Sequence, residues 1–226
     1  MNEKAIKETW SENVILADAD YIDRVAFDLI VNFERMLGRP IPKADLARWI
    51  DCVALDAGMR PLESLPQSGE IGGDSTQVIL LHAKERKQLD NFTPGNYAEE
   101  LDGKAFRDQL GEFCISCIPV ERMTTMEDLF TESLQHICQQ KEVKRLMVVG
   151  DDQYYDRIKA ALGGGQRTNH KSQISNLKSQ IKKNLTPITT TVFTMQPMPG
   201  GRFRQEILGY SLMAALGIKS AEIGDG

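Results

Sequence analysis

The strongest constraint on the fold of this chain is a repeated change between two hydrophobic patterns. Short runs of consecutive apolar residues, typical of buried β-strands, alternate with longer segments whose apolar residues recur every three or four positions, as in amphipathic helices. Helical crossovers between strands place the strands parallel in one sheet, with helices on both faces. Strands are predicted over five runs: residues 13–20, 77–83, 113–120, 145–152 and 187–195.

Helices are predicted between these strands. The clearest has one apolar stripe that begins at Tyr21 and ends before Gly38, a residue type that commonly ends helices. The other helices are predicted over residues 46–57, near Phe106, after a capping box formed by Thr124 and Glu127, over residues 154–162 and over residues 204–217.

These elements together predict an α/β fold, namely a three-layer sandwich with a mostly parallel sheet of about five strands. A length of 226 residues lies within the range of one such domain, so residues 1–226 are predicted to form a single domain. Residues 163–185 have few apolar side chains and are predicted to be a flexible basic insertion. Ligands of such sheets bind beyond the carboxyl ends of the strands.

The charge is distributed unevenly along the chain. The net charge is −5, but residues 157–205 contain nine Lys or Arg and no Asp or Glu. This segment could attract RNA or another phosphate-bearing ligand, whereas the simpler interpretation is a loop kept in solvent by its lysines. The first 13 residues are too charged for a signal peptide, and no apolar run is long enough to span a membrane. The expected location is the cytoplasm.

Acidic residues follow three of the five predicted strands. Asp18 and Asp20 follow the first strand, Glu121 follows the third, and Asp151 and Asp152 follow the fourth. Carboxylates gathered at one edge of a sheet repel one another unless they take up protons or bind a cation such as Mg²⁺ or Mn²⁺. The sequence therefore predicts a divalent-metal site, of a kind that can serve phosphoester chemistry.

Helix capping is the structural alternative for these aspartates. Asp20 and Asp152 are predicted as the N-caps of the helices that follow them, because an aspartate oxygen can accept a hydrogen bond from the first helical turn. Asp18 and Asp151 are less easily explained by capping, so these two are the leading candidates for catalysis.

The segment VVGDDQYYDRIKAAL resembles a late motif of the PIN-like and NYN ribonuclease superfamily, in which an apolar strand precedes Ser-Gly-Asp-x-Asp-Phe and a helix; the aspartate that ends the first strand supports the resemblance. The resemblance implies metal-dependent cleavage of RNA, with Asp18 and Asp151 as metal ligands, Asp152 beside them, and Asp128 or Glu127 from the intervening helix. Two motif positions differ, because the serine is replaced by valine and the second aspartate by glutamine.

Two alternatives remain open. The chain also resembles haloacid-dehalogenase-like phosphatases, which would make Asp18 the nucleophile, Asp20 the acid/base, and Asp151 and Asp152 the metal ligands. The other alternative is a binding or scaffold protein that keeps the fold without the chemistry. Three basic residues are candidate phosphate ligands in these schemes: Lys84, Arg202 and Arg204.

Overall fold

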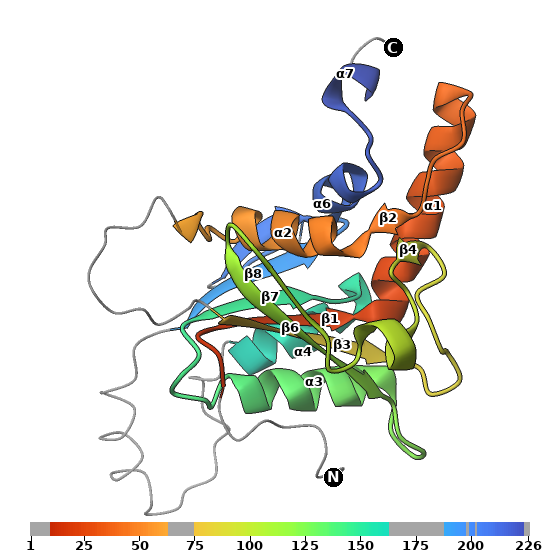
Figure 1. Ribbon diagram of the computed structural model, residues 1–226. Coiled ribbons are helices and arrows are strands. Elements are labelled where there is room, and N and C mark those ends of the chain that lie inside the picture. Colours follow the sequence, from red (N-terminus) through yellow and green to blue (C-terminus); the bar gives the residue numbers. More distant parts are fainter. Residues whose placement is uncertain (1–9, 63–74, 163–187, 198, 202, 224–226) are drawn as a thin grey trace, which may run out of the picture.

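The protein contains a seven-stranded sheet with helices on both faces (Figure 1). The strand order is β5-β6-β3-β1-β7-β8-β9, and every neighbouring pair is parallel except β5 and β6. The strands are β1 (Asn13–Asp18), β3 (Ser75–His82), β5 (Ala105–Asp108), β6 (Gly111–Pro119), β7 (Arg145–Val149), β8 (Thr189–Thr194) and β9 (Arg204–Ile207). The computed structural model describes residues 10–62, 75–162, 188–197, 199–201 and 203–223.

The helices and minor elements lie around this sheet. A separate pair of two-residue strands, β2 (Ala44–Asp45) and β4 (Phe92–Thr93), lies beside the first two helices. The helical elements are α1 (Ala19–Leu37), α2 (Leu46–Asp56), the π-helix η2 (Tyr97–Leu101), α3 (Met126–Ile137), the 3₁₀-helix η3 (Asp152–Tyr154), α4 (Tyr155–Leu162), α6 (Leu208–Ala215) and α7 (Ser220–Ile223).

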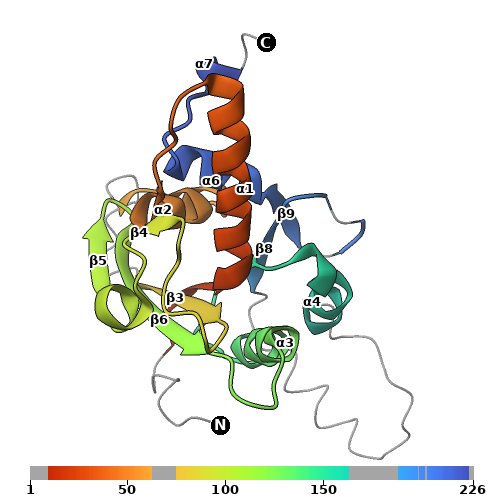
Figure 2. The same cartoon turned by 90° about the vertical axis from the view of Figure 1, so that its right-hand side faces the viewer.

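The central strands are buried on both faces, which explains their continuous apolar runs. Alternate side chains of β1 point in opposite directions, as the pleat of a strand requires. Ile15 and Ala17 belong to the core beneath α1, α2 and α6, whereas Val14 and Leu16 belong to the core beneath α3 and α4. Figure 2 shows these two helical layers on either side of the sheet. The predicted α/β architecture with a mostly parallel sheet is confirmed.

The prediction of about five strands was wrong by two, because both additional strands are short and lie at the edges of the sheet. The short helix predicted near Phe106 is absent, because this residue lies in β5, where its ring stacks on that of Phe113 at 4.9 Å between centroids. The first four residues of the predicted helix 204–217 form β9 beside β8, and α6 begins only at Leu208.

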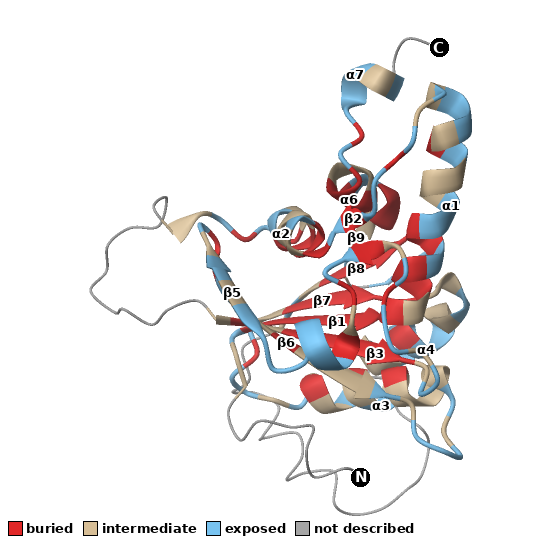
Figure 3. Ribbon diagram, turned by 45° about the vertical axis from the view of Figure 1, so that its right-hand side comes forward, coloured by how far each residue is buried: buried red, intermediate tan, exposed pale blue. Residues whose placement is uncertain are grey.

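Helix α1 connects the sheet to the upper part of the molecule. Its first two turns are mostly buried, whereas its later turns mix exposed and half-buried residues, with Phe33 buried, and extend beyond the sheet (Figure 3). The helix ends at Gly38, whose φ of 63° lies in the left-handed region that glycine adopts without strain. Arg39, the next residue, forms an ion pair with Glu222 of α7 at 2.6 Å.

The strand order creates a switch point at β1. After β1 the chain passes through α1 and α2 to β3 on one side, whereas after β6 it passes through α3 on the opposite face to β7 on the other side. A crevice at the carboxyl ends of the strands is expected where successive connections leave in opposite directions. In the part of the chain that the structure describes, no helix has the length and apolar character required to span a bilayer.

Candidate functional site

Two of the predicted site residues meet at the switch point. Asp18 is the last residue of β1, and Asp151 follows β7 by two residues. The strands are parallel neighbours, with Ala17 opposite Val149, so the chain leaves them at adjacent points of one sheet edge. The carboxylates are close enough for the charge of Asp151 to affect the pKa of Asp18. The predicted convergence of these strand ends therefore occurs.

Gly150, the residue that follows β7, packs closely against α3. A Cβ atom built at Gly150 would lie 2.7 Å from Cζ of Phe130 in α3, a separation at which one of the groups must move. Phe130 is fully buried beneath the sheet and cannot move freely. Close packing thus accounts for the glycine of the Gly-Asp pair.

Asp18 is a buried helix cap. Its Oδ1 accepts a hydrogen bond from the backbone N–H of Tyr21 at 3.0 Å, and its Oδ2 accepts one from the hydroxyl of Tyr154 at 3.0 Å. The prediction that Asp20 caps this helix was wrong, because β1 ends at Asp18 and α1 begins one residue later. Asp20 lies in the first helical turn, where its Oδ2 accepts a hydrogen bond from the backbone N–H of Ala83 at 2.7 Å.

Asp151 is also a cap. It is the N-cap of η3, and its Oδ1 accepts a hydrogen bond from the backbone N–H of Gln153 at 2.9 Å. Its Oδ2 is 2.5 Å from Nη2 of Arg24 in α1, which donates a charged hydrogen bond. The prediction that Asp152 is the cap was wrong by one residue. Asp152 instead accepts a hydrogen bond from the hydroxyl of Tyr21 at 3.3 Å.

The site is electrostatically unfavourable for a negative charge on Asp18. Burial raises the pKa of Asp18 to about 6, and the charges of Asp20 and Asp151 act in the same direction. Burial also raises the pKa of Asp152. The hydrogen bond to Asp151 raises the pKa of Arg24, which is the cation that faces this carboxylate. A substantial fraction of Asp18 is therefore protonated near pH 6.

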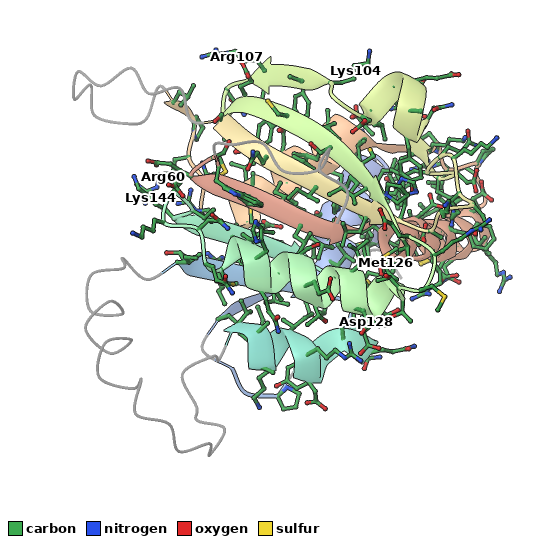
Figure 4. All side chains as sticks on the ribbon, turned by 90° about the horizontal axis from the view of Figure 1, so that it is seen from below. Arg60, Lys104, Arg107, Met126, Asp128 and Lys144 are labelled. Carbon is green, nitrogen blue, oxygen red and sulfur yellow. The ribbon has the colours of Figure 1, made fainter. Side chains whose placement is uncertain are left out.

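The third metal ligand was predicted to come from α3, as Asp128 or Glu127, but Arg157 neutralises both carboxylates. Nη1 of Arg157 in α4 donates a hydrogen bond to Oδ1 of Asp128 at 2.6 Å, and its Nε lies 2.8 Å from the carboxylate of Glu127. The N-cap of α3 is Thr125, so the predicted cap at Thr124 was wrong by one residue. Figure 4 shows Asp128 where the start of α3 lies beside α4.

The predicted phosphate ligands do not converge on this site within the described residues. Lys84 is exposed in the turn after β3. Arg204 is the first residue of β9 and forms an ion pair with Glu206 at 2.6 Å. Arg202 and the predicted insertion at 163–185 lie outside the described residues.

Three residues at the site were not predicted: Tyr21, Arg24 and Tyr154. Tyr21 and Arg24 are one helical turn apart on α1, and the guanidinium of Arg24 lies 5.4 Å from the ring centroid of Tyr21. This spacing was a usable signal, because the predicted helix begins at Tyr21. The hydroxyl of Tyr154 could be connected to Asp18 only after β1 and β7 were known to be neighbours.

The donor chemistry of the site suits Mg²⁺ or Mn²⁺, but its arrangement does not fit a metal ion as folded. Carboxylate oxygens are the preferred ligands of these cations. Across the described stretches of the chain, however, no group of three or more His, Cys, Asp or Glu side chains is placed to hold a metal. A cation between Asp18 and Asp151 would also meet the positive charge of the Arg24 guanidinium, which lies 2.5 Å from Oδ2 of Asp151.

A family model described as "Family of unknown function (DUF6621)" matches residues 7–223, so the chain belongs to this family. Comparison with curated proteins and comparison with solved structures both give no match.

Proposed function

We propose that this member of a family of unknown function is a non-hydrolytic binding protein, built on a PIN-like type of α/β fold, whose partner carries phosphate groups. One observation carries the proposal. All four carboxylate oxygens of Asp18 and Asp151 accept hydrogen bonds from groups of the protein itself. One of these donors is the Arg24 guanidinium, 2.5 Å from Oδ2 of Asp151, so a divalent cation there would meet a positive charge and compete with a charge-assisted hydrogen bond, which is among the stronger kinds.

The sequence of the motif supports the same proposal. Gln153 stands where the resembling ribonucleases carry a second motif aspartate, so one negative charge is missing from the acidic set. Gly150 and Asp151, which match the motif, have structural roles as a close-packing position and a helix cap. A chain can therefore retain these two residues for folding alone.

The proposal of a phosphate-bearing partner rests on charge. Residues 157–205 contain nine Lys or Arg and no Asp or Glu, although the whole chain is acidic. Such a segment attracts polyanions, and RNA is the partner that the resemblance suggests.

Single-stranded RNA is the probe for this proposal. We expect the full chain to bind it without cleavage, and a variant with Lys171, Lys178, Lys182 and Lys183 changed to Gln to bind more weakly. Affinity should fall steeply between about 50 and 200 mM salt if phosphates are contacted. Equal affinity of both proteins, or accumulation of cleaved RNA, would contradict the proposal.

A divalent-metal-dependent phosphodiesterase is the second candidate, favoured by a specific observation. Asp18 and Asp151 converge from neighbouring parallel strands, and burial raises the pKa of Asp18 to about 6, a perturbation typical of functional carboxylates. The two candidates differ in their response to Mn²⁺. If the binding protein is correct, Mn²⁺ leaves the melting temperature unchanged. A rise that the Asp18→Asn/Asp151→Asn double variant lacks would establish a divalent-metal site at these carboxylates, which the phosphodiesterase candidate requires and the binding protein does not.

A further inference from the structure

A second candidate site lies at the amino ends of the strands, on the opposite side of the sheet from Asp18 and Asp151. A cavity of about 520 Å³ opens at the amino ends of β1, β7 and β8, where Asn13, Arg145 and Thr189 are the first residues of these strands. Arg60 and Lys144 also line it, and Figure 4 shows these two side chains close together at one end of the sheet. This amino-edge cavity shares no residue with the switch-point site.

The cavity has an excess of positive charge. Its charged side chains are Arg60, Lys144 and Arg145 against Glu12 alone, and Lys144 is paired with Glu12. Two guanidinium groups therefore remain without a carboxylate partner among the residues that the structure describes.

The hydrogen-bond donors of these two arginines are incompletely used. Nη1 of Arg145 donates to Oδ1 of Asn13 at 3.1 Å, but its Nε is buried and has no acceptor. Arg60 has neither an ion pair nor a side-chain hydrogen bond with any described residue. The buried Nε is closed to a ligand, whereas Arg145 as a whole is only half-buried, so the donors left for a ligand in the cavity are the Arg60 guanidinium and the remaining N–H groups of Arg145.

We propose that the amino-edge cavity binds the phosphate group of a small phosphorylated molecule. Guanidinium groups match phosphate oxygens in geometry and charge and often contact them through two parallel hydrogen bonds. The Thr189 side chain supplies a further neutral donor at the wall. The cavity volume lies within the usual range for small-molecule sites and exceeds what a single phosphate requires. The ligand is therefore a phosphate ester or a diphosphate rather than the free ion alone.

The proposal goes beyond the proposed function, and the two can fail separately, because one is tested with RNA and Mn²⁺ and the other with small anions. Calorimetric titration of the full chain with pyrophosphate, AMP and inorganic phosphate would test it. Pyrophosphate and AMP should bind more tightly than inorganic phosphate, and sodium sulfate at the same ionic strength should not reproduce the heat.

Variants locate the binding. Arg60→Gln removes a guanidinium that has no partner in the described structure, so the fold should be unaffected while pyrophosphate affinity falls about tenfold or more. Arg145→Gln should have at least as large an effect, with unchanged circular dichroism as a control for folding. Lys104→Gln and Arg107→Gln are matched controls, because both residues are exposed beside or within β5 and neither lines the cavity (Figure 4).

The pyrophosphate affinity of the Arg60 variant, compared with that of the two controls, decides whether the cavity is the binding site. Loss of affinity in the Arg60 variant with full affinity in both controls would establish the site. Equal affinity in the Arg60, Lys104 and Arg107 variants would overturn it, since the binding would then be general surface attraction. Absence of any heat from the wild-type chain at about 10 mM pyrophosphate would also overturn it.

Discussion

Replacing Asp18 with asparagine should stabilise the protein, by an amount that depends on pH. Asp18 is 2% exposed, and burial raises its pKa from 3.8 to about 6. Each pKa unit corresponds to 1.36 kcal/mol, so ionised Asp18 disfavours folding by about 3 kcal/mol well above pH 6. Asparagine has the same shape, is a good N-cap, and has no charge to bury.

The direction of this pH dependence follows from the number of protons that the folded and unfolded chains bind. Between pH 3.8 and about 6 the unfolded chain releases the Asp18 proton while the folded chain keeps it, so wild-type stability falls as pH rises through this window. Below pH 3.8 both states are protonated, and above about 6 both are ionised. The two-site expression gives a penalty of about 1.5 kcal/mol at pH 5 and about 3 kcal/mol at pH 8.

The assay is urea unfolding of the wild type and Asp18→Asn at these two pH values. We expect the advantage of the variant to grow by about 1.5 kcal/mol between pH 5 and pH 8. Groups that titrate alike in the wild type and the variant do not affect this change, because their contributions to the two unfolding free energies cancel. Asparagine can also still accept from the Tyr21 N–H and donate to the Tyr154 hydroxyl oxygen. An advantage of the same size at both pH values would refute the electrostatic reasoning.

Two further substitutions test the packing and charge of other regions. Burial, then hydrogen bonding to and repulsion from Asp108, raise the pKa of Asp51 in α2 from 3.8 to about 7. Wild-type stability therefore falls as pH rises from 3.8 to about 7, and Asp51→Asn should gain about 1–2 kcal/mol more at pH 8 than at pH 5, after allowance for the partial exposure of the pair. Thermal unfolding at both pH values would measure this gain, and no pH-dependent gain would contradict it. Gly150→Ala should lose about 1–3 kcal/mol because its Cβ meets Phe130 at 2.7 Å. Urea unfolding should also show partial recovery in Gly150→Ala/Phe130→Leu; unchanged stability of the single variant would show that Phe130 can move.

The fold class was predictable because its signals extend over many residues. The apolar runs of β1 and β7 are buried on both faces, and the stripe of α1 covers five turns, so a few ambiguous residues do not alter the pattern. The two missed strands are short and lie at sheet edges. β5 and β9 each have only four residues, none of them fully buried, and each contains an arginine, a residue type that also favours helices.

The candidate site was predictable only as far as the positions of the strand ends. Parallel pairing brings Asp18 and Asp151 together whatever their hydrogen bonds are. The capping roles were assigned one or two residues too late at Asp18 and Asp151 and one residue too early at Thr125, because the apolar pattern does not define the single residue at which a helix begins. The amino-edge cavity was beyond prediction, since Arg60, Arg145 and Thr189 come from distant parts of the chain.

Capping alone does not explain why residue 18 is an aspartate. The cap needs one oxygen that accepts the Tyr21 N–H, and asparagine supplies that oxygen without burying a charge. Substitutions that stabilise a protein while removing a buried charge are characteristic of functional sites, where activity is retained at the expense of stability. A gain of about 3 kcal/mol in Asp18→Asn at pH 8 would identify residue 18 as such a position without separating the two candidates, because the gain follows from burial of the charge alone. The response to Mn²⁺ separates them, since only the phosphodiesterase candidate requires metal to raise the melting temperature.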